Sequence, residues 1–456
     1  MVGWHSYLRQ HESRNIEELI ELARIPSISA LPEHAGDVAT AAQWVSQRME
    51  SAGLENVQIL PTDGHPVVYS DWLHAGPDQP TALIYAHFDV QPVDPLHLWH
   101  SPPFEPARRE GRIYARGASD DKGNLIAAIQ ALEAMLATEG ELPINIKCLF
   151  EGEEEIGSRN LPAFVEQNRE RLGCDYAISA DSLQWSPQEG NLIIGLKGLA
   201  ALQINVRGAN QDLHSGLYGG TVSNPLHALA QIIASTRGPD GKILVEGFYD
   251  DVRPLSDTDR ALISRAPYDE AEYMGELGLE GLFGEPDYTT RERAWARPTL
   301  EVNGMWGGFQ GEGSKTVIPN EAHAKITCRL VADQHPQRIV EAIVRHAQEH
   351  APPGVVVTAD TFGDRVTPYL MDTDHPGNEA VRVVLAELYG REPYYTRLGG
   401  TIGFVSMMKD MMGVDTLMFG FTLGDEQLHA PNEFYRLDSF DKCQQGYCML
   451  LHELRH

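Results

Sequence analysis

The chain has 456 residues, of which 42% are hydrophobic, and its 36 Lys and Arg residues face 65 Asp and Glu residues, for a net charge of −29. This length exceeds one ordinary hydrophobic core, so we expect two domains or one domain with a large insertion. The negative charge repels phosphate backbones and anionic membranes, which excludes nucleic acid and membrane surfaces as expected partners. Residues 1–21 lack a continuous apolar stretch, so they predict neither a signal peptide nor a membrane anchor, and we expect a cytoplasmic protein.

The five cysteines are an odd, scattered set, and we expect them to be reduced and mostly buried. Cys443 and Cys448 are close in sequence, but no further Cys or Cys/His pair accompanies them at the spacing of a zinc site. A structural zinc ion is therefore not expected.

The chain up to Asp181 alternates between helical and strand patterns. The apolar run 82–86 is typical of a strand that is covered on both faces. A proline-rich loop leads to Asp120. The spacing of the apolar residues after it predicts an amphipathic helix that buries one stripe, formed by Leu125, Ile129, Leu132 and Leu136. This alternation indicates a parallel α/β sheet, which binds ligands outside the carboxyl ends of its strands. The other expected elements are helices at 16–24, 38–52 and 161–171 and strands at 57–60, 67–69, 144–150 and 176–180.

Near Asn191 the pattern changes to that of an inserted α+β domain, and the first pattern resumes after about residue 370. We therefore expect a catalytic domain built from residues 1–190 and 371–456, interrupted by a second domain at 191–370. The elements expected after Asn191 are strands at 192–196, 202–206, 324–330 and 416–421 and helices at 225–235, 336–350 and 377–389.

Several residues that can bind metal follow the expected strands. Two imidazoles and three carboxylates of this kind suit Zn²⁺, Mn²⁺ or Co²⁺, and a bridging Asp120 would give each of two ions one histidine and one further carboxylate. Asp89 lies two residues after His87, so both side chains point the same way on a strand and Asp89 can accept the second ring N–H. The five candidate ligands are His87, Asp120, Glu155, Asp181 and His429.

Each candidate ligand has a simpler interpretation. Asp120 could cap the following helix, and His87 could be a core histidine at a strand end. The acidic run 153–155 could be a solvated surface cluster, while Asp181 and His429 could belong to ordinary turns. The placement of all these groups at one edge of one sheet favours a metal site over the separate interpretations.

Seven ordered segments carry a family resemblance. They resemble the di-metal aminoacylase, carboxypeptidase G and carnosinase family of metallopeptidases, and most closely its cytosolic dipeptidase branch. The segments read Y-A-H-F-D-V, Y-A-R-G-A-S-D-D-K-G, F-E-G-E-E-E-I-G-S, S-A-D-S, D-L-H-S-G, K-T-V-I-P and H-A-P-N-E-F.

The resemblance implies the roles of the metal site. His87 and Asp181 would bind one ion, Glu155 and His429 the other, and Asp120 would bridge them. Glu154 would be the general base. The implied fold is α/β: a discontinuous catalytic domain with a mixed, largely parallel sheet between helices, plus an inserted α+β lid and dimerisation domain. The family often has a cis peptide bond after the bridging aspartate, here Asp120–Asp121, and Asp121 could then cap the helix in place of Asp120.

The resemblance also implies contacts to substrate. His214 would reach the site of the neighbouring subunit of a homodimer and stabilise the oxyanion. Arg329 would bind the substrate's carboxylate, and Thr316, Gly400 and Thr401 would hold its backbone. The sequence departs from the dipeptidase pattern at Asn303, where a histidine is expected, and in the long acidic insertion at about 250–293.

These observations predict a metal-dependent hydrolase that cleaves dipeptides or other short peptides with two divalent ions per subunit, Zn²⁺ first and Mn²⁺ or Co²⁺ as alternatives. An N-acyl amino acid amidase, such as a deacetylase or desuccinylase, is the alternative hydrolase, because the metal centre would be the same and only lid contacts would differ. A non-catalytic metal-binding protein is disfavoured because Glu154 is present.

Overall fold

The computed structural model describes residues 3–363 and 365–455, which divide into two compact units. The first unit comprises the described residues up to Ile194, Met371–Tyr395 and the residues from Gly403 onward. The second comprises Gly195–Leu370 and Thr396–Ile402. It thus takes in a short segment that the sequence led us to expect in the last part of the catalytic domain.

A six-stranded sheet forms the centre of the first unit. Its strand order is β1-β2-β6-β3-β7-β18, with antiparallel pairing at β1–β2 and β2–β6 and parallel pairing from β6 through β18. The expected mixed, largely parallel sheet is therefore confirmed. Every residue of β2 and β6 is buried, as both faces of a covered sheet require. The strands are β1 (Glu55–Leu60), β2 (Val67–Trp72), β6 (Asn145–Glu151), β3 (Thr81–His87), β7 (Tyr176–Ser179) and β18 (Thr416–Met418).

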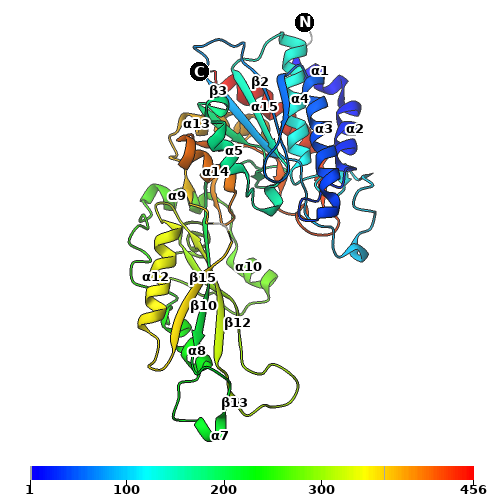
Figure 1. Ribbon diagram of the computed structural model, residues 1–456. Coiled ribbons are helices and arrows are strands. Elements are labelled where there is room, and N and C mark those ends of the chain that lie inside the picture. The colour runs from blue at the N-terminus through cyan, green and yellow to red at the C-terminus, as the bar shows by residue number, and fades with distance from the viewer. Residues whose placement is uncertain (1–2, 364, 456) are drawn as a thin grey trace. The chain divides into compact units, whose positions relative to one another are not determined.

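Helices cover this sheet (Figure 1): α3 packs on β1 and β2, α4 on β3, and α13 on β18. Asn168 divides the helix expected at 161–171 into two, because it ends α5 and starts α6 outside the helical backbone conformation. The helices are α1 (Trp4–Gln10), α2 (Glu12–Ala23), α3 (Ala35–Ser51), α4 (Lys122–Glu139), α5 (Leu161–Gln167), α6 (Arg169–Leu172), α13 (Pro376–Tyr389), α14 (Gly403–Met407) and α15 (Leu437–Glu453).

The expectation of one apolar stripe on α4 is wrong. From Lys122 to Leu132 all residues of this helix are buried, because α1, α2, α15 and β3 pack around it. A helix enclosed by protein on all sides does not need a polar face, and α4 fills the core beside the sheet.

Short strands complete the first unit. Three form a small sheet in the order β20-β5-β4, and β8 pairs with β19 in parallel. The strand expected at 416–421 breaks between β18 and β19. Their bounds are β4 (Ala107–Arg109), β5 (Arg112–Tyr114), β8 (Leu183–Gln184), β19 (Thr422–Leu423) and β20 (Phe434–Arg436).

The second unit is built on a four-stranded antiparallel sheet in the order β12-β14-β10-β15. Burial alternates along β14; α8 packs on β14 and β10, and α12 packs on β10 and β15. An apolar core fills the space between them. The elements are β10 (Gly198–Arg207), β12 (Thr299–Gly307), β14 (Glu321–Leu330), β15 (Val356–Thr361), α8 (Pro225–Ser235) and α12 (Pro336–Glu349).

The acidic insertion forms three short helices, and two further strand groups complete the chain. β11 and β13, which are distant in the sequence, pair in an antiparallel manner, and β9 lies between β16 and β17. Among the residues that the structure describes, no helix has the length and apolar character needed to cross a membrane. The bounds are α7 (Ser215–Tyr218), α9 (Asp257–Arg265), α10 (Glu270–Leu277), α11 (Thr290–Ala296), β9 (Asn191–Leu196), β11 (Leu213–His214), β13 (Val317–Ile318), β16 (Tyr369–Leu370) and β17 (Tyr394–Leu398).

Gly420 allows the segment that follows β18 to lie close to the segment that follows β7 and carries Asp181. A Cβ atom at this position would lie 1.9 Å from the carbonyl oxygen of Ala180 and 2.8 Å from the backbone nitrogen of Ser182. We expect Gly420→Ala to destabilise the protein by about 3 kcal/mol, because neither backbone can yield without moving Asp181. The apparent Tm, measured by circular dichroism, should fall by roughly 6 °C or more.

Gly424→Ala is the matched control, because a Cβ atom there meets no atom within 4 Å. Equal Tm values for the two variants would contradict the close approach of Gly420 to the backbone of Ala180 and Ser182.

Candidate metal centre

Three of the five candidate ligands lie at or after the carboxyl ends of strands in the parallel part of the sheet, as expected. His87 ends β3, the pair Glu154 and Glu155 follows β6, and Asp181 follows β7. Asp120 lies immediately before α4 in the buried loop that leads into that helix. These positions are fixed by buried strands, so the polar side chains start from a rigid edge.

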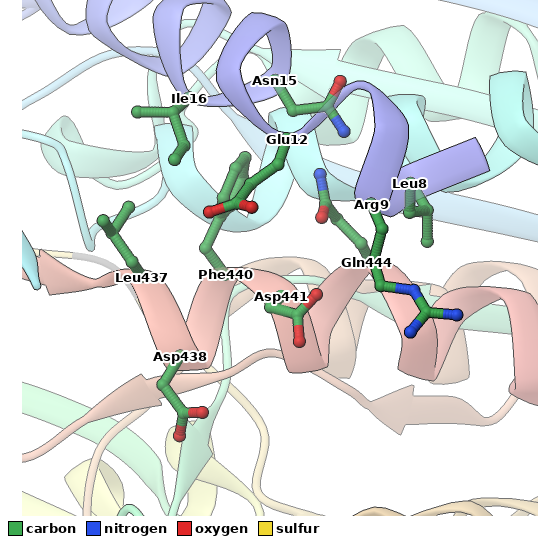
Figure 2. Close-up of a pocket in the computed structure, with 10 residues that line it drawn as sticks. All are labelled: Leu8, Arg9, Glu12, Asn15, Ile16, Leu437, Asp438, Phe440, Asp441 and Gln444. Carbon is green, nitrogen blue, oxygen red and sulfur yellow. The ribbon is translucent and has the colours of Figure 1, made fainter. Parts of the chain in front are cut away.

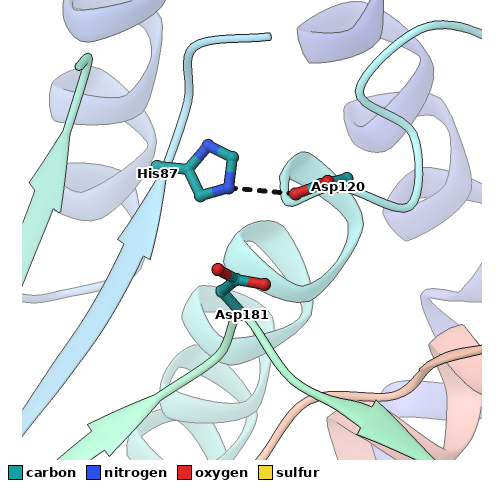
Figure 3. A group of neighbouring side chains, drawn as sticks. All are labelled: His87, Asp120 and Asp181. Atoms are coloured by element: carbon teal, nitrogen blue, oxygen red, sulfur yellow. Dashed lines mark hydrogen bonds and ion pairs between the residues drawn. The ribbon is translucent and has the colours of Figure 1, made fainter. Parts of the chain in front are cut away.

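The structure brings three of these residues into a first group. His87, Asp120 and Asp181 each offer a ligand atom, and these atoms lie within 4.8 Å of one another. Figure 3 shows His87 at the end of its strand, Asp120 on the loop before its helix and Asp181 between two strands. The Nε2 atom of His87 lies 3.1 Å from Oδ1 of Asp120.

A second group shares Asp120 with the first. Asp120, Glu155 and His429 also offer ligand atoms within 4.8 Å of one another. The Nε2 atom of His429 lies 3.0 Å from Oδ2 of Asp120 and 3.1 Å from Oε2 of Glu155. Asp120 therefore presents one oxygen to each group.

The two histidines carry raised pKa values. Burial disfavours the charged form of His87, but hydrogen bonds with Asp120 and Asp89 outweigh it and hold the pKa of His87 well above its usual value. Hydrogen bonds with Asp120 and Glu155 raise the pKa of His429 to about 10. Both imidazoles thus face concentrated negative charge.

The carboxyl groups of the site also have shifted pKa values, because several of them are buried close together. Burial and the nearby Asp120 carboxylate raise the pKa of Asp181 to about 7 and also raise the pKa of Glu155. Burial, opposed by His87 and reinforced by Asp181, raises the pKa of Glu154 well above its usual value. Buried carboxylates so close together need positive charge, and oxygen and imidazole donors are those that Zn²⁺ and similar ions accept. The donor set therefore fits two divalent cations.

Asp89 makes a second set of contacts besides the expected one to His87. The Nδ1 atom of His87 lies 3.1 Å from the backbone oxygen of Asp89 and 3.5 Å from its Oδ1 atom, so the backbone is the nearer acceptor. The Asp89 carboxylate accepts hydrogen bonds from the backbone N–H groups of Glu154, at 3.2 Å, and Glu155, at 3.1 Å. Asp89 thus holds the turn that carries both glutamates.

Glu433 holds the loop of Asp120, and sequence reasoning missed it. Its fully buried carboxylate accepts hydrogen bonds from the backbone N–H groups of Gly117, Ser119 and Asp120, at 2.9 to 3.1 Å. Nη1 of buried Arg116 donates to the same carboxylate at 2.6 Å. Glu433 lies within the segment H-A-P-N-E-F, directly before two buried aromatic residues, and an acid in such a place is a signal that could have found it.

Asp120 and Asp121 are joined by a cis peptide bond, as the resemblance implied. The expectation that Asp121 caps α4 is wrong, because its side chain accepts no capping hydrogen bond from that helix. Asp121 Oδ2 instead accepts the backbone N–H of His87 at 3.4 Å, and Oδ1 accepts a hydrogen bond from Asn124 at 2.9 Å. It links the Asp120 loop to the end of β3.

The other predicted site residues lie in the second unit. His214 and Thr316 are exposed neighbours at the β11–β13 pair, where the N–H of Ser215 donates to the backbone oxygen of Thr316 at 3.0 Å. Arg329 lies near the carboxyl end of β14 and donates from Nη1 to Thr401 Oγ1 at 2.9 Å. Gly400 is exposed beside Thr401.

A separate cavity of about 340 Å³ lies in the first unit between the helices α1, α2 and α15 (Figure 2). It contains none of the predicted site residues, so the candidate chemistry does not coincide with it. The lining residues are Leu8, Arg9, Glu12, Asn15, Ile16, Leu437, Asp438, Phe440, Asp441 and Gln444.

Comparison with known proteins gives the class. Residues 83–453 match peptidase family M20/M25/M40. The Beta-Ala-His dipeptidase of Homo sapiens is 30% identical over 94% of this chain and 87% of its own, and the Cys-Gly metallodipeptidase dug1 of Schizosaccharomyces pombe is 29% identical over 96% and 95%. The M20 family metallo-carboxypeptidase Sso-CP2 of Sulfolobus solfataricus superimposes with a TM-score of 0.82 at 33% identity, over 97% of this chain and 99% of its own.

The chain belongs to peptidase family M20/M25/M40. The resemblance found in the sequence is thereby confirmed, including its dipeptidase branch. The protein is a metal-dependent hydrolase of peptide bonds, and its two ligand groups offer places for divalent ions.

The role of Glu433 in holding the Asp120 loop can be tested by removing its negative charge. We expect Glu433→Gln to weaken metal binding and to destabilise the fold by roughly 3 kcal/mol, because the Arg116 charge loses its buried partner and an amide N–H₂ faces backbone donors. Thermal unfolding and metal titration of the apoprotein would measure the two effects. Glu50→Gln on the exposed face of α3 is the control, and an equally small change in both variants would contradict the role of Glu433.

Proposed function

We propose that this protein hydrolyses dipeptides and other short peptides at a centre of two divalent ions, Zn²⁺ before Mn²⁺ or Co²⁺. The observation that carries the proposal is that two ligand groups share one carboxylate, with one oxygen of Asp120 near each histidine. The named dipeptidase activities of the relatives support a dipeptide as the substrate.

In this proposal His87 and Asp181 hold one ion, Glu155 and His429 hold the other, and Asp120 bridges them. Two such ions, when bound, acidify a water molecule and polarise the peptide carbonyl. The histidines must be neutral to act as ligands, so binding displaces the protons that their raised pKa values favour.

Glu154 is the proposed general base. It lies next to Glu155 in the turn whose N–H groups Asp89 holds, and its carboxyl group is close enough to both ligand groups for the charges of His87 and Asp181 to act on it. Glu154 takes the proton of the attacking water and later delivers it to the leaving amine. Positive charge bound beside it offsets the burial and repulsion that raise its pKa, and so keeps it ready to accept a proton.

The second unit is the proposed lid and dimerisation domain. Arg329 pairs with Leu199 at one end of the β10–β14 ladder, while Glu321, eight residues earlier, pairs with Arg207 at the end from which the chain runs on to His214. Eight residues of a strand span about 27 Å. A dipeptide cannot bridge that distance, so His214 and Arg329 of one chain would serve different sites of a homodimer.

A metallo-carboxypeptidase is the second candidate. The similarity to Sso-CP2 favours it, and so does the position of Arg329, whose guanidinium can bind a terminal carboxylate in either activity. Cleavage of longer peptides at their carboxyl ends would distinguish it from a dipeptidase. N-acyl amino acids belong in the same substrate panel, since they test the amidase alternative.

Five unpaired cysteines support the proposed cytoplasmic location, because disulfides persist mainly in oxidising compartments.

Glu154→Gln and Asp120→Asn separate catalysis from metal binding. Glu154→Gln should retain two ions per chain yet lower kcat on a dipeptide by about 10³-fold, since it removes the proton acceptor. Asp120→Asn should lose metal as well as activity. Elemental mass spectrometry and a panel of dipeptides, longer peptides and N-acyl amino acids would measure both, and near-normal kcat in Glu154→Gln would remove it from the base role.

Sharing of His214 between subunits can be tested in verified heterodimers. A His214→Ala chain paired with a Glu154→Gln chain should regain about half of the wild-type activity, because one of its two sites is then intact. The matched control pairs a wild-type chain with a chain that carries both changes, and it should be nearly inactive. The opposite order of activities would show that each chain uses its own His214.

A further inference from the structure

Lys197 is a buried cation that no step of the proposed mechanism uses. Only 4% of its surface is exposed, although Lys is among the residues least often buried without a partner. Its ammonium donates to the backbone oxygen of Arg293 at 3.4 Å, a long hydrogen bond. Among the residues that the structure describes, Lys197 forms no ion pair with a carboxylate. Lys122 in the first unit is likewise buried with backbone oxygens as its hydrogen-bond acceptors, so what distinguishes Lys197 is the second cation, Arg329, that acts on it.

The backbone of Lys197 forms hydrogen bonds with the segment that carries Thr401. Its N–H donates to the backbone oxygen of Leu398 at 3.1 Å, and its carbonyl accepts a hydrogen bond from Thr401 Oγ1 at 2.5 Å. Thr401 Oγ1 in turn accepts the hydrogen bond from Arg329. A continuous hydrogen-bonded path therefore runs from the Arg329 guanidinium to the backbone carbonyl of Lys197.

Other charged groups near Lys197 add positive rather than negative charge. Arg329 and Arg297 both act on its ammonium, and Arg297 is already neutralised by Glu285 at 2.8 Å. Arg397 on β17 lines a small cavity with Lys197 but forms its own ion pair with Asp259. Arg329, like Lys197, has no carboxylate partner among the described residues. Two uncompensated cations thus lie together in the second unit.

We propose that Lys197 is a positioning and specificity-determining residue that strengthens binding of the substrate's carboxylate at Arg329 and makes this binding depend on pH. The inference rests on the proposed function, in which Arg329 binds that carboxylate. The cavity beside Lys197, of about 20 Å³, has room for roughly one water molecule and not for a peptide, so Lys197 acts through Arg329 and Thr401 rather than by touching substrate.

The direction of the pH effect follows from the burial of Lys197. Burial, together with Arg329 and Arg297, lowers the pKa of Lys197 to about 8. Below that pH the ammonium is charged and attracts a carboxylate. Above it the amine is neutral and the attraction is lost. KM for a peptide with a free carboxylate should therefore rise as pH increases through about 8, while kcat is unaffected.

The kinetic test compares a dipeptide with its C-terminal amide from pH 6.5 to 9.5. At pH 7, Lys197→Met should raise KM for the dipeptide about fivefold to tenfold with kcat unchanged, and should flatten the pH profile. Lys197→Arg, which stays charged, should restore a low KM that no longer rises with pH. The amide should show none of these effects. Lys242→Met, at an exposed site of the same unit, is the control.

A titration that needs no turnover separates this inference from the proposed function. The titration follows the NMR signal of Lys197 in metal-loaded protein with ¹³C-labelled lysine, and Lys197→Met assigns that signal. The midpoint of the titration should lie near pH 8 and should shift to higher pH in Arg329→Met. Acetate should raise the midpoint in the wild type and not in Arg329→Met. An unchanged midpoint in Arg329→Met, or no response to acetate, overturns the inference. A chain that passes this titration but cleaves no peptide would instead count against the proposed function.

Discussion

The buried carboxylate of Glu433 holds the loop on which both ligand groups depend. Asp120 is the residue that the groups share, and its backbone N–H, with those of Ser119 and Gly117, ends on Glu433. The charge of Arg116 balances that carboxylate inside the protein. Because a buried charge without such partners costs several kcal/mol, the loop has few alternative conformations of similar free energy. The direction of the Asp120 carboxylate follows from this constraint.

A second set of hydrogen bonds brings the remaining donors to the same place. Asp89 holds the turn of Glu154 and Glu155, and Asp121 links the Asp120 loop to the backbone of His87. In each case an acidic side chain accepts hydrogen bonds from the backbone and is not a member of either candidate ligand group. The acids thus divide into those that hold the backbone and those that are candidate metal ligands, although all of them lie within the same short motifs. This division explains how so many carboxylates can be buried together.

The sequence was sufficient to predict which candidate ligands come together but not what supports them. The apolar run 82–86 and the polar residue that follows it located His87, because the end of a buried strand is fixed by the sheet register. The support from Glu433 joins residues more than 300 positions apart, and no local pattern encodes such a contact. The same limit explains the error on α4, whose full burial depends on α15 from the other end of the chain. The sequence also could not show that Asp89 accepts hydrogen bonds from backbone N–H groups, because nearly every residue carries such a group.

Two places in the molecule carry opposite charge, and the contrast bears on specificity. In the first unit, buried acids are concentrated around a place for cations. In the second unit, Arg329 and Lys197 are cations without carboxylate partners among the described residues, in a chain whose net charge is −29. Two neighbouring cations without a carboxylate partner repel each other, and an anion from outside would relieve that repulsion. A peptide carries such an anion at its carboxyl terminus, so the proposed role of Arg329 and Lys197 is to recognise that end of a substrate by charge rather than by shape.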